Sequence, residues 1–284
     1  SHLEKASALN PQEVQYLIDC ANVLARQNQH GRAIVFWDKA LEIVHDDIGL
    51  WHNKSQSHIE MGDFDSALES YRSALAIAPE HLDLWCNFAG ILKRAGRLSE
   101  SLDAWQKALA LNPDSARALS GMGAIKLDQE QYPEARQLLQ KAIQIDSDSF
   151  EARGNLTLVA IGESKFDEAM DHFKVQPEPW RVSVQGTEIH ANILDGLGRE
   201  ALMSGEFNQA EALIRSALEK NPELSTSWFN LGQVLRVHGE WESAIEAYEK
   251  SASCGQGDIN AQVAAWLTLP ILYQSDDEIV EARQ

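Results

Sequence analysis

Residues 82–113 read LDLWCNFAGILKRAGRLSESLDAWQKALALNP and hold two amphipathic patterns with a glycine between them. The first pattern starts with Trp85, and its apolar and small residues recur at intervals of three and four, which is typical of one face of a helix. Gly96 interrupts this pattern, and a second one with the same spacing runs until Pro113 stops it. The stretch therefore predicts a helix, a tight turn and a second, antiparallel helix.

The same order of residues recurs along the chain at an interval of 34 residues. The copies share a Trp or Leu, then small residues, a Gly, and then Ala and an aromatic residue, as around Trp228, Gly232 and Tyr248. This order closely resembles the tetratricopeptide repeat family, whose repeat has the same length. The resemblance implies an all-α fold, a right-handed α-solenoid or superhelix of helix-turn-helix repeats. We expect seven repeats, starting near Val14, Ile48, Leu82, Ala116, Phe150, Ala191 and Ser225.

The register of the repeats divides the chain into segments. Residues 1–13 match the end of a second helix, so we expect them to close a truncated upstream repeat and the chain to be part of a longer protein. The remaining expected segments are repeats one to five at 14–176, an irregular insertion at 177–190, repeats six and seven at 191–258, and a half-repeat helix with a C-terminal linker at 259–284.

The register shifts once, near Pro177 and Pro179. Because proline is poorly tolerated inside a helix, the preceding helix is predicted to end near Gln176 and residues 177–187, PEPWRVSVQGT, to form a loop. The next first helix is expected near Ala191, with a possible upstream extension from Glu188. Two interpretations remain open: a tolerated surface insertion, or a bend that reorients two groups of repeats.

Composition narrows the classes of partner. The formal charge of −19 makes nucleic acid and anionic membrane surfaces poor partners, because binding them requires clustered Lys and Arg. No run approaches the roughly 18 apolar residues of a membrane span. Cys20, Cys86 and Cys254 are widely spaced and odd in number, which favours free thiols and a cytoplasmic location.

No catalytic or metal-binding motif stands out in the sequence. The nine histidines do not cluster with cysteines at zinc-ligand spacing, and there is no nucleophile elbow or phosphate-binding loop. We therefore expect no catalysis by this chain, no metal and no cofactor. The aromatic residues have helical spacing, which predicts core packing over ligand stacking, and they are Trp51, Trp85 and Trp228 on first helices and Trp37, Trp105, Tyr71 and Tyr248 on second helices.

The resemblance implies that the first helices line a concave groove and that the sixth place of each points into it. These places hold Asp19, Asn53, Asn87, Gly121, Asn155, Gly196 and Asn230. An amide side chain offers donors and an acceptor, so a row of Asn suits the main chain of an extended peptide. Asn that merely packs between helices is the alternative, and the two glycines break the row.

A carboxylate clamp, a second mode known in this family, fits the sequence less well. Asn22 and Asn53 occupy suitable places, but Ile18, Asp83 and Asn87 stand where that clamp needs cations. Isolated basic groups remain that could contact the side chains of a bound segment. The expected groove residues are thus Asn22, Asn53, Asn87, Asn155, Asn230, Lys93, Arg94, Arg117, Arg199 and Arg236.

The end of the chain, from Leu272 to Arg283, resembles the segment that joins repeats to a catalytic region in bacterial proteins of the O-linked N-acetylglucosamine transferase and SPINDLY family. The asparagine row resembles theirs as well. The resemblance implies a module that recruits extended polypeptide to a bacterial O-linked glycosyltransferase. The alternatives are a free-standing scaffold or adaptor that assembles a protein complex, and self-association into a homo-oligomer.

Overall fold

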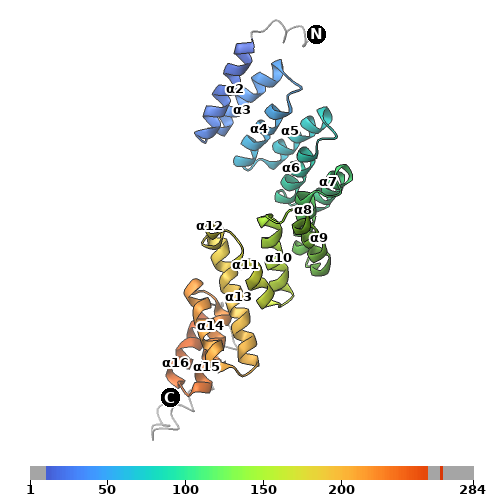
Figure 1. Ribbon diagram of the computed structural model, residues 1–284. Coiled ribbons are helices and arrows are strands. Elements are labelled where there is room, and N and C mark those ends of the chain that lie inside the picture. The colour runs from blue at the N-terminus through green and yellow to red at the C-terminus, as the bar shows by residue number, and fades with distance from the viewer. Residues whose placement is uncertain (1–10, 255–262, 265–284) are drawn as a thin grey trace. The chain divides into compact units, whose positions relative to one another are not determined.

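The computed structural model describes residues 11–254 and 263–264, which contain fifteen helices and no strand. The chain divides into two compact units, unit 1 at 1–149 and unit 2 at 150–284. Each unit is a stack of antiparallel helix pairs (Figure 1). The predicted all-α solenoid of helix-turn-helix repeats is confirmed. The expected truncated repeat at 1–13 and the half-repeat at 259–284 lie almost entirely outside the described residues.

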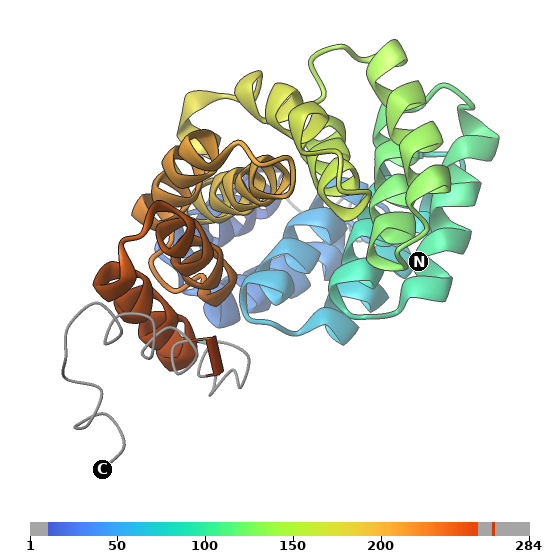
Figure 2. The same cartoon turned by 90° about the horizontal axis from the view of Figure 1, so that it is seen from below.

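Unit 1 contains four helix pairs that follow one another in chain order (Figures 1 and 2). In each pair the first helix packs against the second, and the second packs against the first helix of the next pair. The helices are α2 (Pro11–Arg26), α3 (His30–Ile43), α4 (Ile48–Glu60), α5 (Phe64–Ile77), α6 (Leu82–Arg94), α7 (Leu98–Leu111), α8 (Ala116–Asp128) and α9 (Tyr132–Ile145).

Unit 2 contains three helix pairs and one additional short helix (Figure 1). Its core is formed by apolar side chains of consecutive helices, as in unit 1. The helices are α10 (Phe150–Gly162), α11 (Phe166–Lys174), α12 (Glu178–Arg181), α13 (Val184–Met203), α14 (Phe207–Lys220), α15 (Ser225–His238) and α16 (Trp241–Cys254).

The turn inside each pair has one residue in the left-handed region, where glycine is favoured because it lacks a Cβ. Four of these residues are glycines, at Gly62, Gly96, Gly205 and Gly239, and three are not. The intervals between them are 34 residues, except for 41 between Ser164 and Gly205. The turns therefore follow the 34-residue repeat, with one insertion of seven residues between Ser164 and Gly205. The three non-glycine residues are Asn28, Glu130 and Ser164.

The two helices of a pair approach closely where both carry a small residue, and these two residues lie twelve positions apart in the sequence. In α4 and α5 they are Ser55 and Ala67, and the Ser55 hydroxyl donates a hydrogen bond of 3.0 Å to the Ala67 carbonyl. In α6 and α7 the order is reversed, and the Ser101 hydroxyl donates to the Ala89 carbonyl at 2.7 Å. All four residues are fully buried.

The predicted aromatic core is confirmed on the second helices, where Trp37, Tyr71, Trp105 and Tyr248 are at most 5% exposed. The three tryptophans of the first helices are only half-buried. Each of these donates its indole N–H to the carbonyl six residues earlier: Trp51 to His45 at 2.9 Å, Trp85 to Pro79 at 2.7 Å, and Trp228 to Pro222 at 2.8 Å. Their indoles thus tie the preceding loop to the helix.

The predicted loop at 177–187 is wrong. Helix α12 spans Glu178–Arg181, because Pro177 and Pro179 stand at its N-cap and in its first turn, where a missing N–H costs nothing. Helix α13 starts at Val184, since the Ser183 hydroxyl accepts the N–H of Gly186 at 3.1 Å.

The inserted residues are absorbed by a longer first helix. Helix α13 has 20 residues, against 13 in α10. Seven residues make about two helical turns, so the extension displaces the helical face by only about 20°. The next turn, at Gly205, can therefore resume the repeat with its apolar face still directed at the core.

Candidate functional site

Four polar side chains, one each from α4, α5, α6 and α8 of unit 1, form a chain of hydrogen bonds that ends at Arg117. Arg117 Nη2 on α8 donates to Asn87 Oδ1 on α6 at 2.6 Å. The Asn87 side chain also hydrogen-bonds the hydroxyl of Tyr71 on α5, and that hydroxyl lies 2.5 Å from His52 Nδ1 on α4. Asp83 Oδ1 lies 4.0 Å from Arg117 Nη1. We call His52, Tyr71, Asp83, Asn87 and Arg117 the Arg117 cluster.

The pKa values of the cluster agree with this order of donors. Burial, followed by the charge of Arg117, lowers the pKa of His52 below its ordinary value. Burial raises the pKa of Tyr71 to about 12, although the hydrogen bond from Asn87 and the charge of Arg117 act against it. A neutral imidazole and a protonated phenol are thus favoured, so the Tyr71 hydroxyl can donate to His52 Nδ1 while it accepts from the Asn87 amide.

The repeat register places these groups together. In two repeats the sixth place of a first helix lies next to the aromatic residue of the preceding second helix, sixteen positions earlier: Asn87 lies next to Tyr71, and Gly121 lies next to Trp105. The Tyr71 ring is 2% exposed, so only its hydroxyl needs a polar partner. Arg117 is a different case, because its side chain is 52% exposed and its guanidinium reaches the surface.

Both glycines in the predicted row have a steric reason. A Cβ on Gly121 would lie 2.4 Å from two atoms of the Trp105 indole, and a Cβ on Gly196 would lie 2.2 Å from the Phe166 ring. At these two places the aromatic ring of the earlier helix occupies the space of a side chain. At these two places the sixth residue therefore faces a neighbouring helix.

The structure distributes the predicted asparagines over different environments. Asn22, Asn53 and Asn155 are half-buried. Asn230 is only 9% exposed, and the amide of Asn87 is held by Arg117 and Tyr71. For Asn87 and Asn230 this supports packing between helices, the alternative left open by the sequence. Their role in peptide binding stays a prediction.

Four of the five predicted basic groups have a partner within the chain, and their contact with a bound segment stays a prediction. Lys93 Nζ lies 3.0 Å from Asp128 Oδ2, and Arg117 binds Asn87. Arg94 lies 5.2 Å above the centre of the Phe64 ring, and Arg199 lies 5.6 Å above that of Phe166. A guanidinium over an aromatic face is attracted by the ring and covers it from solvent.

A pocket in unit 2, formed by α10, α12 and α13, is not predicted by the sequence. It has a volume of about 470 Å³ and is lined by Asn155 together with Trp180, Gln176 and Gln185. Gln176 is 4% exposed, and its Nε2 donates to the Phe150 carbonyl at 3.3 Å. We call the whole cavity, with the residues that line it, the Trp180 pocket. Its only predicted residue is Asn155, because the pocket depends on the helix α12 that the sequence was expected to lack.

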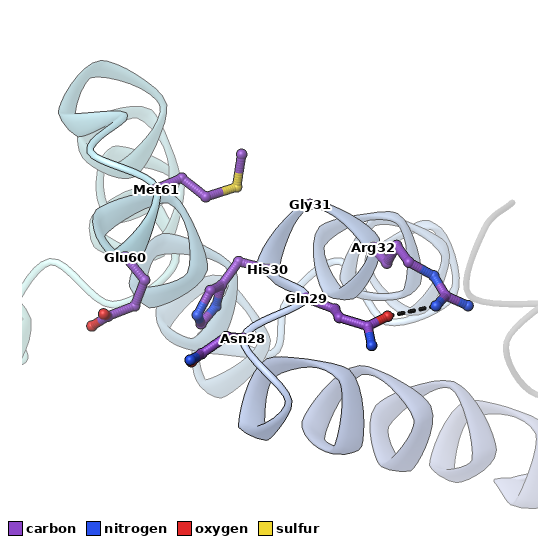
Figure 3. Close-up of a pocket in the computed structure, with 7 residues that line it drawn as sticks. All are labelled: Asn28, Gln29, His30, Gly31, Arg32, Glu60 and Met61. Atoms are coloured by element: carbon purple, nitrogen blue, oxygen red, sulfur yellow. Dashed lines mark hydrogen bonds between the residues drawn. The ribbon is translucent and has the colours of Figure 1, made fainter.

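A larger hollow of about 740 Å³ lies in unit 1. Figure 3 shows that the residues around it come from the turn between α2 and α3, from the first turn of α3 and from the end of α4, and that the hydrogen bond drawn joins Arg32 to Gln29. Both residues belong to the same side of the hollow. It contains none of the predicted groove residues.

Among the described residues, no group of three His, Cys, Asp or Glu side chains gathers in a way that could hold a metal ion. The three cysteines are free, and Cys86 is buried. No helix in the described part of the chain has the length and apolar character needed to span a membrane.

Two family models match the chain. Residues 56–172 match the model described as the middle tetratricopeptide-repeat-like domain of cilia and flagella-associated protein 70. Residues 196–259 match a model described as a tetratricopeptide repeat. No curated protein sequence matches the chain.

Solved structures with the same fold share little sequence with the chain. A tetratricopeptide repeat protein from Parabacteroides merdae is 20% identical, with 91% of this chain and 99% of that one covered and a TM-score of 0.57. YrrB, described as a tetratricopeptide repeat protein with an unusual peptide-binding site, is 21% identical over 69% of this chain and 98% of its own, with a TM-score of 0.55. PilF of Pseudomonas aeruginosa is 15% identical over 74% and 93%, with a TM-score of 0.58. Identities this low carry the fold alone.

Proposed function

The chain is a tetratricopeptide repeat protein, and on this basis we propose that it is a protein-interaction module whose first helices bind an extended polypeptide. One observation carries the proposal. Within unit 1, His52, Asn87 and Arg117 come from three successive first helices and are linked through Tyr71. Polar groups of neighbouring repeats therefore form one connected surface, where an extended segment could contact several repeats at once.

The groups in this surface differ in what they can offer a ligand. The Asn87 side-chain amide already has two hydrogen-bond partners, so its main role is to position Arg117 and Tyr71. The Arg117 guanidinium is half-exposed and has further N–H donors for a main-chain carbonyl or a carboxylate. Asn53 is half-buried, and its amide can both donate to and accept from a peptide main chain. We assign binding to Asn53 and Arg117, and their support to Asn87.

The test uses peptides selected from a random display library on the whole chain, because the natural partner is unidentified. The double variant Asn53→Ala, Arg117→Ala should weaken the selected peptides by about tenfold or more, since truncating a charged partner and an amide removes several hydrogen bonds. The matched control is Asn208→Ala, Arg215→Ala, which removes the same side-chain types from the second helix α14. Equal affinity for the wild type and the double variant, with unchanged helicity, would refute the proposal.

Recruitment of acceptor polypeptides to an O-linked glycosyltransferase is a finer prediction. It comes from the resemblance of the C-terminal segment, and neither the two family models nor the solved structures described above support it. The coding sequence that follows Gln284 would test it directly. A nucleotide-sugar-binding catalytic region there would support recruitment, and its absence would favour a scaffold or adaptor. A cytoplasmic location and homo-oligomer formation likewise stay predictions.

A further inference from the structure

We propose that the Trp180 pocket is an anchor site that takes one large apolar side chain of an extended, non-acidic partner segment. The proposal rests on the proposed function, because it specifies what the bound polypeptide must carry. It concerns unit 2 alone, whereas the groups assigned above to main-chain binding lie in unit 1. The two can therefore fail separately.

The pocket exists because the second helix of this repeat is short. Helix α11 has 9 residues, whereas α14 and α16 each have 14. Beyond Lys174 the chain turns at Pro177 into α12, and the space beside α10 is bordered by Trp180 and Gln176. In a complete repeat, the missing helical turns would lie along the first helix.

The walls combine apolar surface with amides. Leu158, Ile189, Phe150 and Trp180 contribute apolar atoms, and the Phe150 side chain is 52% exposed. The Trp180 ring is held by Phe173, whose centroid lies 5.9 Å away and which is 3% exposed. A rigid aromatic wall and an exposed phenylalanine suit a buried anchor residue, the usual centre of binding energy in an interface.

Three exposed valines stand within two positions in the sequence of residues that line the pocket. Val182 and Val184, which flank α12 and open α13, are 70% and 79% exposed, and Val175 is 54% exposed. Large apolar side chains that gather on one short segment mark an interaction surface more often than an ordinary solvent face. The segment on either side of an inserted anchor would therefore also meet apolar groups.

The charge of the lining selects against acidic partners. Among the described residues that line the pocket, Glu151 is the one with an ionisable side chain, and it is exposed. Asn155, Gln176 and Gln185 are neutral and can pair with a main chain that passes the opening. With a formal chain charge of −19, a carboxylate next to the anchor would be repelled, while a neutral or basic neighbour would not.

Gly154 offers a way to fill the pocket without disturbing the fold. A Cβ there would lie 3.7 Å from Gln176 Nε2 and 3.9 Å from Trp180 Cζ2, both ordinary contacts. Since Gly154 lies inside α10, a leucine also improves helix propensity. The variant Gly154→Leu should thus fold and place its side chain in the pocket.

The experiment selects peptides from a random display library on the whole wild-type chain and measures their affinity for variants by calorimetry. We expect selected peptides to share one aromatic or long aliphatic residue without acidic neighbours, and to bind Gly154→Leu and Trp180→Ala about tenfold more weakly or worse. The control is Gly90→Leu on α6, where a Cβ meets no atom within 4 Å. Its affinity should equal that of the wild type.

Each other outcome has a defined meaning. Peptides without a shared apolar residue, or peptides that bind Gly154→Leu as tightly as the wild type, overturn the anchor site. If those same peptides are weakened by Asn53→Ala, Arg117→Ala, the proposed function survives without the pocket. A wild-type dimer in sedimentation that Gly154→Leu abolishes would assign the pocket to a second copy of the chain and overturn the peptide assignment as well.

Discussion

Arg117 Nη2 donates a hydrogen bond of 2.6 Å to Asn87 Oδ1, and the two residues lie on different first helices, α8 and α6. The bond occupies one lone pair of the amide that the sequence assigned to a peptide ligand. It also holds a cation close enough to His52 to lower the pKa of that imidazole. Arg117 is thus the residue through which the polar surface of unit 1 can be altered most directly.

The variant Arg117→Ala should raise the pKa of His52. Loss of the nearby positive charge favours the imidazolium, but burial, the larger cause of the shift, remains, so the pKa should stay below the ordinary 6.5. Titration of the His52 ring C–H signals by NMR measures the change. Lys107→Ala on α7 removes an exposed cation outside the cluster and should leave the His52 curve unchanged. An unchanged curve in Arg117→Ala would mean that the two charges do not interact.

The same shift predicts how stability depends on pH. Because the pKa of His52 is lower in the folded than in the unfolded chain, the unfolded chain takes up the proton first. The contribution of His52 to stability is complete above about pH 6.5 and is lost as the pH falls toward the folded pKa. Denaturant titrations from pH 7 to 5 should show a smaller loss in His52→Gln than in the wild type, and an equal loss would contradict the assignment.

The raised pKa of Tyr71 predicts that the folded chain loses stability at alkaline pH. Its pKa is about 12 in the folded chain, against an ordinary value of 10.0, so the unfolded chain ionises first. Between these values the free energy of unfolding should fall by up to about 1.4 kcal/mol per pH unit. Tyr71→Phe removes this contribution and leaves all other titrations in place. The difference between the two denaturation series isolates Tyr71, and parallel series would show that its pKa is not raised.

Gly121→Ala should destabilise unit 1 by about 1–3 kcal/mol, because the new methyl group would overlap the buried Trp105 indole. Gly90→Ala is the matched control in another first helix, where no atom lies within 4 Å of the new Cβ. That change should be neutral or stabilising by up to about 1 kcal/mol. Thermal denaturation measures both. A similar effect of the two substitutions would argue against a clash with Trp105.

Glu130→Gly and Ser164→Gly should each stabilise the chain by about 0.5–1 kcal/mol. Both residues have a φ of 57°, where a side chain is strained and glycine is not. Asn28, with a φ of 58°, should gain less on replacement by glycine, because asparagine tolerates this conformation better. Gly96→Ala should show the opposite sign. Urea denaturation of the four variants tests the order, which a reversed ranking of Asn28 and Glu130 would contradict.

The sequence was sufficient for the fold, because the repeat signal comes from local spacing. Glycines at the turns and small residues at the helix crossings are set by contacts within a pair, and these recur every 34 residues. The error at 177–187 has a local cause. The prediction treats proline as the end of a helix, whereas Pro177 and Pro179 stand at the start of one, and Ser183 caps the next. The sequence signal for these two helices is Pro179, a residue type common in the first turn of a helix, followed by Ser183, a common N-cap residue.

The candidate site was harder to predict from the sequence than the fold. The reason is that the side-chain contacts between repeats differ in type from one repeat to the next. The register correctly places Asn87 and Gly121 at equivalent positions, but it cannot tell that one meets the Tyr71 hydroxyl and the other the face of an indole. Nor does spacing reveal that Arg117 bonds to an amide thirty residues earlier. The Trp180 pocket depends on a departure from the repeat, so a method that reads periodicity passes over it.

The buried crossings at Ser55 and Ser101 suggest how tolerant the repeat is to exchange. In one pair the hydroxyl belongs to the first helix, and in the other to the second, yet each reaches the carbonyl opposite. Natural variation must preserve the distance between the two helix backbones at this point. Either helix of the pair can supply the serine hydroxyl. Swapping serine and alanine within a pair is therefore a neutral route along which such sequences can diverge while their architecture persists.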